Sequence, residues 1–196
     1  MQWKRVDALH DLPHLAEEHI VFFAREYKIR GGYSAGETNQ LILNFKKVGN
    51  KRGSTEWHYR ELAVERFANE LYSLLNEVPC SIMAVPTSKA PTDPQYTNRF
   101  EDLFACLSSR LPQANFECPL ALPATVLSAH AGGQRLPAEL AKQYDWLGLK
   151  NANAELMVVV DDVLTTGGHF RAVHDCLRAN GFRGAIVGAC WARALL

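Results

Sequence analysis

The stretch from Met157 to Phe170, MVVVDDVLTTGGHF, places two adjacent carboxylates between an apolar run and a turn rich in hydroxyls and glycines. The apolar run predicts a strand that is buried on both faces, and the glycines predict a turn into a following helix. Asp161 and Asp162 would then stand at the carboxyl end of a strand, where open parallel sheets bind their ligands. Carboxylates accept hydrogen bonds, and the neighbouring hydroxyls of a sugar are suitable donors.

The segment from Thr165 to Gly168 follows these acids and leads into the predicted helix. At a helix amino terminus, free backbone amides and the helix dipole both favour a bound phosphate. Together with the two acids, this segment predicts a site for a ribose 5-phosphate. The alternative is a turn in which the acids only cap the next helix, since short motifs of this kind also occur by chance.

The run VVVDDVLTTGG resembles the phosphoribosyl-pyrophosphate signature of type I phosphoribosyltransferases. The resemblance implies that Asp161 and Asp162 contact the ribose 2- and 3-hydroxyls, and that the loop from Leu164 to Gly168 cradles the 5-phosphate. It also implies a Mg²⁺ ion on the pyrophosphate and the ribose hydroxyls, which reaches the two acids only through those hydroxyls or water. The resemblance covers roughly residues 80 to 191 and implies a ligand-binding set of Thr87, Ser88, Lys89, Asp161, Asp162, Val163, Leu164, Thr165, Thr166, Gly167, Gly168 and His169.

Two further loops are similar to loops of this family. The segment VPTSKAP, with Lys89, follows an earlier predicted strand, as the pyrophosphate-binding loop of the family does. The segment SAHAGGQR, with Arg135, resembles the mobile loop that closes over the site. The resemblance therefore assigns stabilisation of the departing pyrophosphate to Lys89 and Arg135. The alternative is that both are solvated loop residues, as most lysines and arginines are.

The chain also departs from the family pattern. His169 stands where a threonine or serine is common, and a histidine that binds phosphate would make the contact depend on pH. Ala90 follows the basic residue of the pyrophosphate loop, where a glycine is frequent. The upstream segment, with a tyrosine, glycines and LILNFKK, is similar to the ComF-type branch of the family, but the chain lacks that branch's cysteine-rich zinc module.

Three functions are compatible with these residues. The resemblance implies an enzyme that transfers phosphoribose to a nitrogenous base or amine and releases pyrophosphate. A second hypothesis is an inactive regulator that senses phosphoribosyl pyrophosphate or a nucleotide 5-phosphate. The third is a ComF-like accessory protein of a DNA-uptake or defence pathway. The sequence leaves the acceptor unknown, and members of the family often form homodimers.

The pattern of apolar residues predicts strands that alternate with helices. We expect a helix over 57–78, a strand over 80–85, a loop over 86–98, a helix over 100–111 and a strand near 123–127. A short helix before residue 140, the strand and helix of the signature with Gly181 at its end, and a strand over 185–191 complete the core. This order predicts an α/β fold with a parallel sheet flanked by helices, Rossmann-like and of the type I phosphoribosyltransferase kind.

The first part of the chain differs from this pattern. The segment HLAEEHIVFFAREY, residues 14–27, predicts a helix, and LILNFKK, residues 41–47, predicts an edge strand. We therefore predict a small N-terminal hood lobe over residues 1–53, resting on a core of residues 54–196. The basic segment KKVGNKR, residues 46–52, is interpreted as a solvated loop.

Composition excludes some classes of function. The chain has 21 Lys and Arg against 21 Asp and Glu, which argues against nucleic acid as a direct ligand. The sequence has no segment near the roughly 20 apolar residues that span a bilayer and no apolar core of a signal peptide at its start, so we expect a cytoplasmic protein with no membrane contact. Its 5 cysteines are odd in number and widely spaced, which predicts reduced core residues.

Overall fold

A six-stranded sheet in the order β1-β2-β8-β7-β3-β4 forms the centre of the protein in the computed structural model, which describes residues 2–7, 9–126 and 136–195. Four of its neighbouring pairs are parallel, and β1 runs antiparallel to β2 at one edge. The strands are β1 (Lys4–Arg5), β2 (Ile20–Lys28), β3 (Cys80–Ala84), β4 (Ala114–Phe116), β7 (Leu156–Leu164) and β8 (Ala185–Leu195). The protein therefore has an α/β fold that is compatible with a Rossmann-like arrangement.

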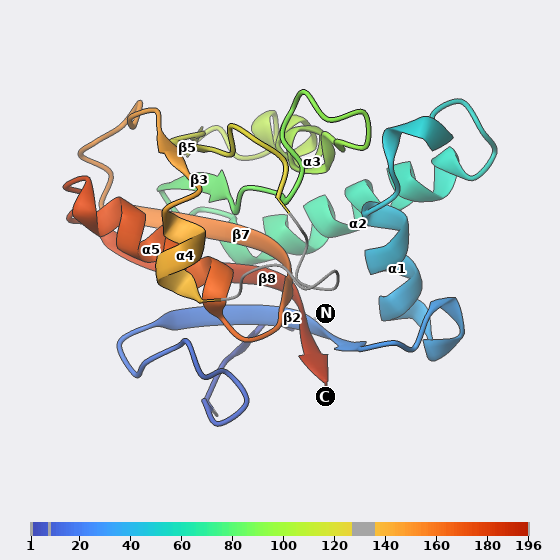
Figure 1. The fold of residues 1–196 in the computed structure, drawn as a ribbon, viewed down its shortest axis with the longest axis horizontal. Coiled ribbons are helices and arrows are strands. Elements are labelled where there is room, and N and C mark those ends of the chain that lie inside the picture. The colour runs from blue at the N-terminus through green and yellow to red at the C-terminus, as the bar shows by residue number, and fades with distance from the viewer. Residues whose placement is uncertain (1, 8, 127–135, 196) are drawn as a thin grey trace.

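Helices cover both faces of this sheet (Figure 1). On one face, α1 (Glu37–Phe45), α2 (Trp57–Leu75) and α3 (Arg99–Ser108) supply the apolar residues of one core cluster. On the other, α5 (Gly168–Ala179) packs into a second cluster and α4 (Pro137–Ala141) packs against α5. Shorter elements complete the described chain: η1 (Tyr33–Ala35), η2 (Gly49–Lys51) and a separate two-stranded antiparallel sheet of β5 (Leu120–Ala121) and β6 (Asp145–Trp146).

Strand β7 shows why the apolar run folds as it does. Val158 and Val160 pack into the cluster under α2, while Met157 and Val159 pack into the cluster under α5. Side chains alternate along a strand, so a strand with helices on both faces must be apolar at every position. The prediction of a doubly buried strand here is confirmed.

The order of the strands places a topological switch point between β3 and β7. The chain leaves β3 through α3 toward β4, on one side, and leaves β7 through α5 toward β8, on the other. Because α3 and α5 lie on opposite faces, the loops after β3 and β7 diverge at the carboxyl edge. In open α/β sheets, ligands bind at such a point. The predicted site residues that the structure describes lie in these two loops, at the end of β7 or at the start of α5.

The N-terminal predictions need correction. Residues 20–28 form the strand β2, not a helix, and residues 37–45 form the helix α1 where an edge strand was predicted. Strand β2 pairs in parallel with β8 from Ile20 to Lys28, so this part of residues 1–53 belongs to the central sheet and not to an appended hood. The run of β-branched and aromatic residues fits an extended strand, and β8 supplies the partner that makes it one.

Helix α2 is where predicted, although it ends at Leu75 and not at residue 78. On this helix Arg60 and Glu70 are buried, at 2% and 5% exposed, while Tyr59 and Leu62 are exposed. Each buried charge has a partner: Arg60 binds Asp102, and Glu70 binds Arg25. The N-cap residue of this helix is Glu56, whose side chain makes no capping hydrogen bond.

The remaining core predictions are largely confirmed. The strands β3 and β8, the helices α3, α4 and α5, and the loop over 86–98 are present, but the strand near 123–127 is absent from the described residues 123–126. All five cysteines are free thiols, and Cys106 and Cys118 are exposed and thus not core residues. Among the described residues, none of the helices combines the length and apolarity needed to cross a bilayer.

Candidate functional site

The acid pair lies near the carboxyl end of strand β7, at the switch point and next to the start of the loop after β3. Ala84 pairs with Val160, and the amide of Val85 donates to the carbonyl oxygen of Val160 at 2.9 Å. The loop that begins at Pro86 therefore starts beside Asp161. Two loops that the sequence assigned to one ligand are neighbours at the carboxyl edge.

The loop from Thr165 to Gly167 turns the chain from β7 into α5. Gly167 has φ 81°, in the left-handed region that favours glycine, and the helix begins at Gly168. A Cβ atom on Gly167 would lie 2.5 Å from Cγ of Leu15, and the amide of His14 donates to the carbonyl oxygen of Thr166 at 3.2 Å. The N-terminal segment thus packs on this loop and fixes its shape.

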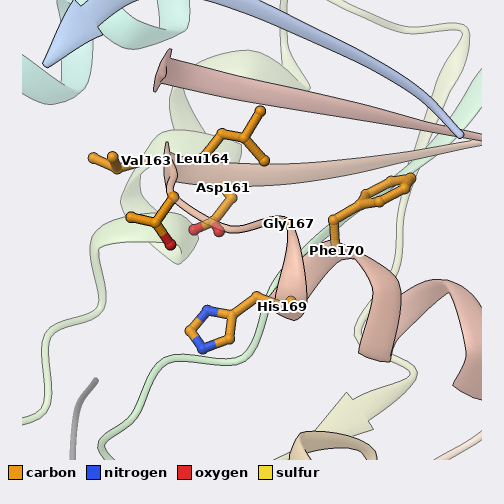
Figure 2. A pocket seen from close by; sticks show the side chains of 8 residues that line it. Asp161, Val163, Leu164, Gly167, His169 and Phe170 are labelled. Carbon is orange, nitrogen blue, oxygen red and sulfur yellow. The ribbon is translucent and has the colours of Figure 1, made fainter. Parts of the chain in front are cut away.

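A shallow hollow lies at this loop, and most of its roughly 190 Å³ of empty space is open to solvent. Figure 2 shows the Asp161 carboxylate and the His169 ring on the same side of Gly167, with the Phe170 ring pointing back toward the sheet. Apolar atoms back the hollow, and a carboxylate with the amino end of α5 borders it. The lining residues are Asp161, Val163, Leu164, Thr165, Gly167, Gly168, His169 and Phe170.

Asp162 is buried and is held by two cations. One of its oxygens lies 2.8 Å from Nζ of Lys46, and the other lies 3.0 Å from a terminal nitrogen of Arg99. Lys46 is the C-cap residue of α1, and Arg99 is the first residue of α3. Although burial alone would raise the pKa of Asp162, these two cations lower it overall, so the carboxylate is anionic at neutral pH.

Asp161 has different surroundings. One of its oxygens accepts the backbone amide of Asp162 at 2.8 Å, and its side chain borders the hollow. Burial and the neighbouring Asp162 carboxylate raise the pKa of Asp161 well above its usual range. The phenol of Tyr144 lies near enough that burial, together with the Asp161 charge, also raises the pKa of Tyr144. The two acids of the pair are thus chemically distinct.

His169 is the first side chain after the glycines and lines the same hollow. Burial lowers the pKa of His169 below its ordinary value of 6.5, more than the Asp162 carboxylate raises it. The imidazole is therefore neutral at neutral pH and can donate one N–H to an anion. The expected pH dependence of such a contact is displaced to acidic pH.

The loop after β3 carries the predicted pyrophosphate residues Thr87, Ser88 and Lys89. The amide of Val126 donates to the carbonyl oxygen of Ser88 at 3.0 Å, and the hydroxyl of Thr87 donates to the carbonyl oxygen of Lys89 at 3.0 Å. The Lys89 ammonium lies 3.4 Å from a carboxylate oxygen of Asp93 and is partly exposed. The loop is ordered by its own hydrogen bonds and carries its cation at the surface.

Ala90 fits this loop without backbone strain. It is buried, and its amide donates to the hydroxyl of Thr125 at 3.1 Å. In the described chain, the non-glycine residues with positive φ are Arg30 and Glu77, so Ala90 has a backbone conformation open to any residue. The glycine that is frequent at this position in the family is not required here.

Sequence reasoning missed Lys46 and Arg99. Lys46 belongs to the basic segment interpreted as a solvated loop, and Arg99 follows a loop without any signal of its own. Both reach Asp162 only through the fold, because they are far from it in sequence. The predicted catalytic residue Arg135 lies outside the described residues.

A Mg²⁺ ion at this hollow would have to be held mainly by a bound ligand. Among the described residues, no three His, Cys, Asp or Glu side chains gather around one point. Asp162 is already paired with cations, so Asp161 is the carboxylate at the hollow. Mg²⁺ commonly takes one or two carboxylates and completes its shell with phosphate oxygens and water. Asp161 could contribute to such a shell through a water or a sugar hydroxyl.

Comparison of the sequence with models of known protein families and with curated proteins finds no match.

Proposed function

We propose that this protein is a phosphoribosyltransferase-like protein that binds phosphoribosyl pyrophosphate with Mg²⁺ and transfers the phosphoribose to a nitrogenous base or amine. The observation that carries the proposal is the position of the signature residues. The acid pair lies near the end of β7 and the glycine loop follows it, beside the loop after β3, at the switch point of the sheet. The finer assignment, a type I phosphoribosyltransferase fold, is part of the same proposal.

The binding mode follows from the donors and acceptors at the hollow. The backbone amides of Thr165 to Gly168 and the amino end of α5 bind the 5-phosphate, with the neutral His169 as an added donor. Asp161 accepts hydrogen bonds from ribose hydroxyls. The hydroxyls of Thr87 and Ser88 and the ammonium of Lys89 contact the pyrophosphate. Gly167 keeps this loop packed on the N-terminal segment, because a side chain there would clash with Leu15.

The reaction is a displacement at the anomeric carbon. The bond from this carbon to the pyrophosphate oxygen breaks, the electron pair leaves with pyrophosphate, and a nitrogen of the acceptor forms the new bond. Positive charge develops on the sugar, and the acid pair stabilises it. Lys89 stabilises the charge on the leaving group, and bound Mg²⁺ supplies further neutralisation there.

The test is a calorimetric titration with phosphoribosyl pyrophosphate and MgCl₂. We expect binding by the wild type and its loss in the Asp161→Asn, Asp162→Asn double variant. The Asp175→Asn variant is the control, because this partly exposed acid of α5 pairs with Arg171 away from the hollow. A folded wild type that gives no heat of binding at millimolar ligand would refute the proposal.

A sensor without turnover is the second candidate. The observation that favours it is the pairing of Lys89 with Asp93, which reduces the charge available to a leaving group. The assay is pyrophosphate release with a panel of purine, pyrimidine and amine acceptors. Binding in the titration without release for any acceptor would favour the sensor, while release that disappears in Lys89→Met would favour the enzyme.

A further inference from the structure

The two carboxylates of the acid pair face different parts of the molecule. Both oxygens of Asp162 are within 3.0 Å of a cation, and its side chain is 6% exposed. Asp161 instead lines the hollow beside His169 (Figure 2), and no salt bridge joins it to any of the described residues. A sugar hydroxyl that approached Asp162 would have to displace an ion pair. At Asp161 it would meet a carboxylate already at the hollow.

Adjacent positions on a strand explain this difference. Successive side chains of β7 point to opposite faces, so one acid turns toward α1 and α3 and the other toward α5. Arg99 is itself fixed, because its other terminal nitrogen donates to the hydroxyl of Thr97 at 2.9 Å and its guanidinium lies over the Phe100 ring at 5.1 Å. Asp162 therefore has a rigid partner on one oxygen and the end of α1 on the other.

We infer that the acid pair divides its work: Asp161 alone contacts the ribose hydroxyls, while Asp162 is a positioning residue that Lys46 and Arg99 hold in place. This inference rests on the proposed function. Its consequence is that Lys46, in a segment far from the signature, controls how well the signature binds its ligand. Lys46, at the end of α1, holds the Asp162 carboxylate, and the backbone amide of Asp162 donates a hydrogen bond to the Asp161 carboxylate.

The first test compares ligands with and without a ribose hydroxyl. The probes are ribose 5-phosphate and its 2-deoxy and 3-deoxy analogues, titrated calorimetrically. We expect the wild type to prefer ribose 5-phosphate over at least one analogue by roughly tenfold or more, the value of a hydrogen bond to a charged group. In Asp161→Asn this preference falls to about twofold or less. In Asp162→Asn the affinities for ribose 5-phosphate and for its deoxy analogues fall by the same factor, so the preference remains.

The second test replaces the lysine that holds Asp162. We expect Lys46→Met to weaken ribose 5-phosphate binding by roughly tenfold without changing the preference among analogues, and Lys46→Arg to restore it to within about threefold. Lys47→Met is the matched control, because Lys47 is the neighbouring lysine and donates to the carbonyl oxygen of Glu56 at the surface. It should bind as the wild type does. Circular dichroism verifies that each variant is folded. If Asp162→Asn is not folded, Lys46→Met takes its place in the comparison of ribose 5-phosphate with its deoxy analogues.

The outcomes separate the two proposals. No binding of ribose 5-phosphate or phosphoribosyl pyrophosphate by the folded wild type overturns both. Binding by the wild type, with the hydroxyl preference lost equally in Asp161→Asn and Asp162→Asn, leaves the proposed function intact and overturns the division of work. Equal binding by Lys46→Met and the wild type also overturns it, because Lys46 would then position nothing.

Discussion

At the residue scale, Gly167 carries two constraints that only glycine satisfies together. Its φ of 81° is costly for any side chain, and a Cβ atom would lie 2.5 Å from Leu15. Gly181, after α5, shares the positive φ of 89° but has open space around its Cβ position. Alanine substitutions at the two glycines therefore distinguish the cost of a positive φ from the cost of a clash with Leu15.

We predict that Gly167→Ala lowers the free energy of unfolding by about 2–4 kcal/mol, against about 1 kcal/mol for Gly181→Ala. The larger effect arises because the alanine must also displace Leu15 and thus the segment that supports the loop from Thr165 to Gly167. Urea denaturation followed by circular dichroism gives both values. Equal losses of unfolding free energy in the two variants would show that Leu15 moves aside without destabilising the protein.

The residue scale is also where the sequence predicted most. The acid pair, the glycine turn and the loop with Lys89 form local patterns, and each is found at the predicted place. Lys46 and Arg99 could not be predicted, because nothing local distinguishes them from other surface cations. Their contact with Asp162 exists only once α1, α3 and β7 have packed together.

At the element scale, one buried ion pair joins α2 to α3. Arg60 is 2% exposed, donates to a carboxylate oxygen of Asp102 at 2.7 Å and lies 4.5 Å from the centre of the Trp57 ring. Asp102 itself is 36% exposed in its side chain. A buried cation needs its counter-ion more than an exposed acid needs its cation. The pair thus fixes the helix that begins at Arg99.

We predict that Asp102→Asn lowers the free energy of unfolding by about 2 kcal/mol, because Arg60 keeps its charge in the core without a counter-ion. Adding Arg60→Met should recover part of this loss, since the apolar side chain can still pack against Trp57. Chemical denaturation of the two single variants and the double variant measures the coupling. A double variant whose loss is the sum of the single losses would contradict the ion-pair account.

Helices and strands whose apolar residues recur with a clear helical or strand period were predictable from the sequence. The N-terminal elements were not. The sequence of β2 satisfies a helical period as well as an extended run, and its pairing with β8, more than 150 residues later, decides the outcome. In α1, Ile42 and Phe45 are buried on one side, and Asn39 is buried where it binds the backbone of Lys28. These contacts are long-range, so propensity alone favoured the wrong structure.

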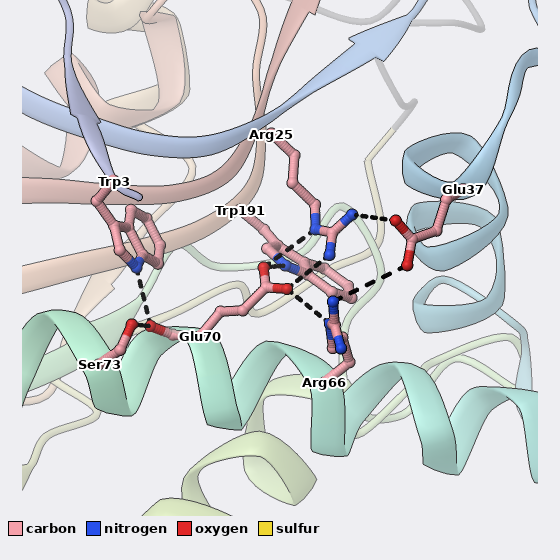
Figure 3. Close-up of polar contacts among 7 residues, drawn as sticks. All are labelled: Trp3, Arg25, Glu37, Arg66, Glu70, Ser73 and Trp191. Atoms are coloured by element: carbon pink, nitrogen blue, oxygen red, sulfur yellow. Dashed lines mark hydrogen bonds and ion pairs between the residues drawn. The ribbon is translucent and has the colours of Figure 1, made fainter. Parts of the chain in front are cut away.

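At the scale of the whole molecule, a buried network around Glu70 connects the N-terminal segment to the core (Figure 3). Two nitrogens of Arg25 donate to the Glu70 carboxylate at 2.6 and 3.0 Å, and the indole of Trp191 donates to it at 2.8 Å. Trp3 donates to the carbonyl oxygen of Glu70 at 2.8 Å. The network joins β2, α2 and β8, which explains why residues 20–28 lie in the sheet and not in a separate lobe.

Glu70 also makes stability depend on pH. Burial would raise the pKa of Glu70, but the hydrogen bonds from Arg25 and Trp191 and the charge of Arg25 lower it below the ordinary 4.5. A carboxylate whose pKa is lower in the folded state stabilises the fold above its unfolded pKa. That stabilisation is present at neutral pH, begins to decline as the pH falls below about 4.5, and is lost as the pH passes through the folded pKa.

We predict that Glu70→Gln lowers the free energy of unfolding by about 3 kcal/mol at pH 7, because the buried Arg25 is left with the exposed Glu37 as its one counter-ion among the described residues. The difference between the wild type and Glu70→Gln should be constant from pH 7 to about 5 and should shrink at lower pH, since the wild type loses its carboxylate and the variant has none to lose. Denaturation midpoints measured from pH 7 to pH 3 give this difference directly.

The control is Glu65→Gln, because Glu65 is an exposed acid on the same helix, and its stability should follow that of the wild type at each pH. A gap that stays the same down to pH 3 would mean that Glu70 stabilises the molecule by packing and not by its charge.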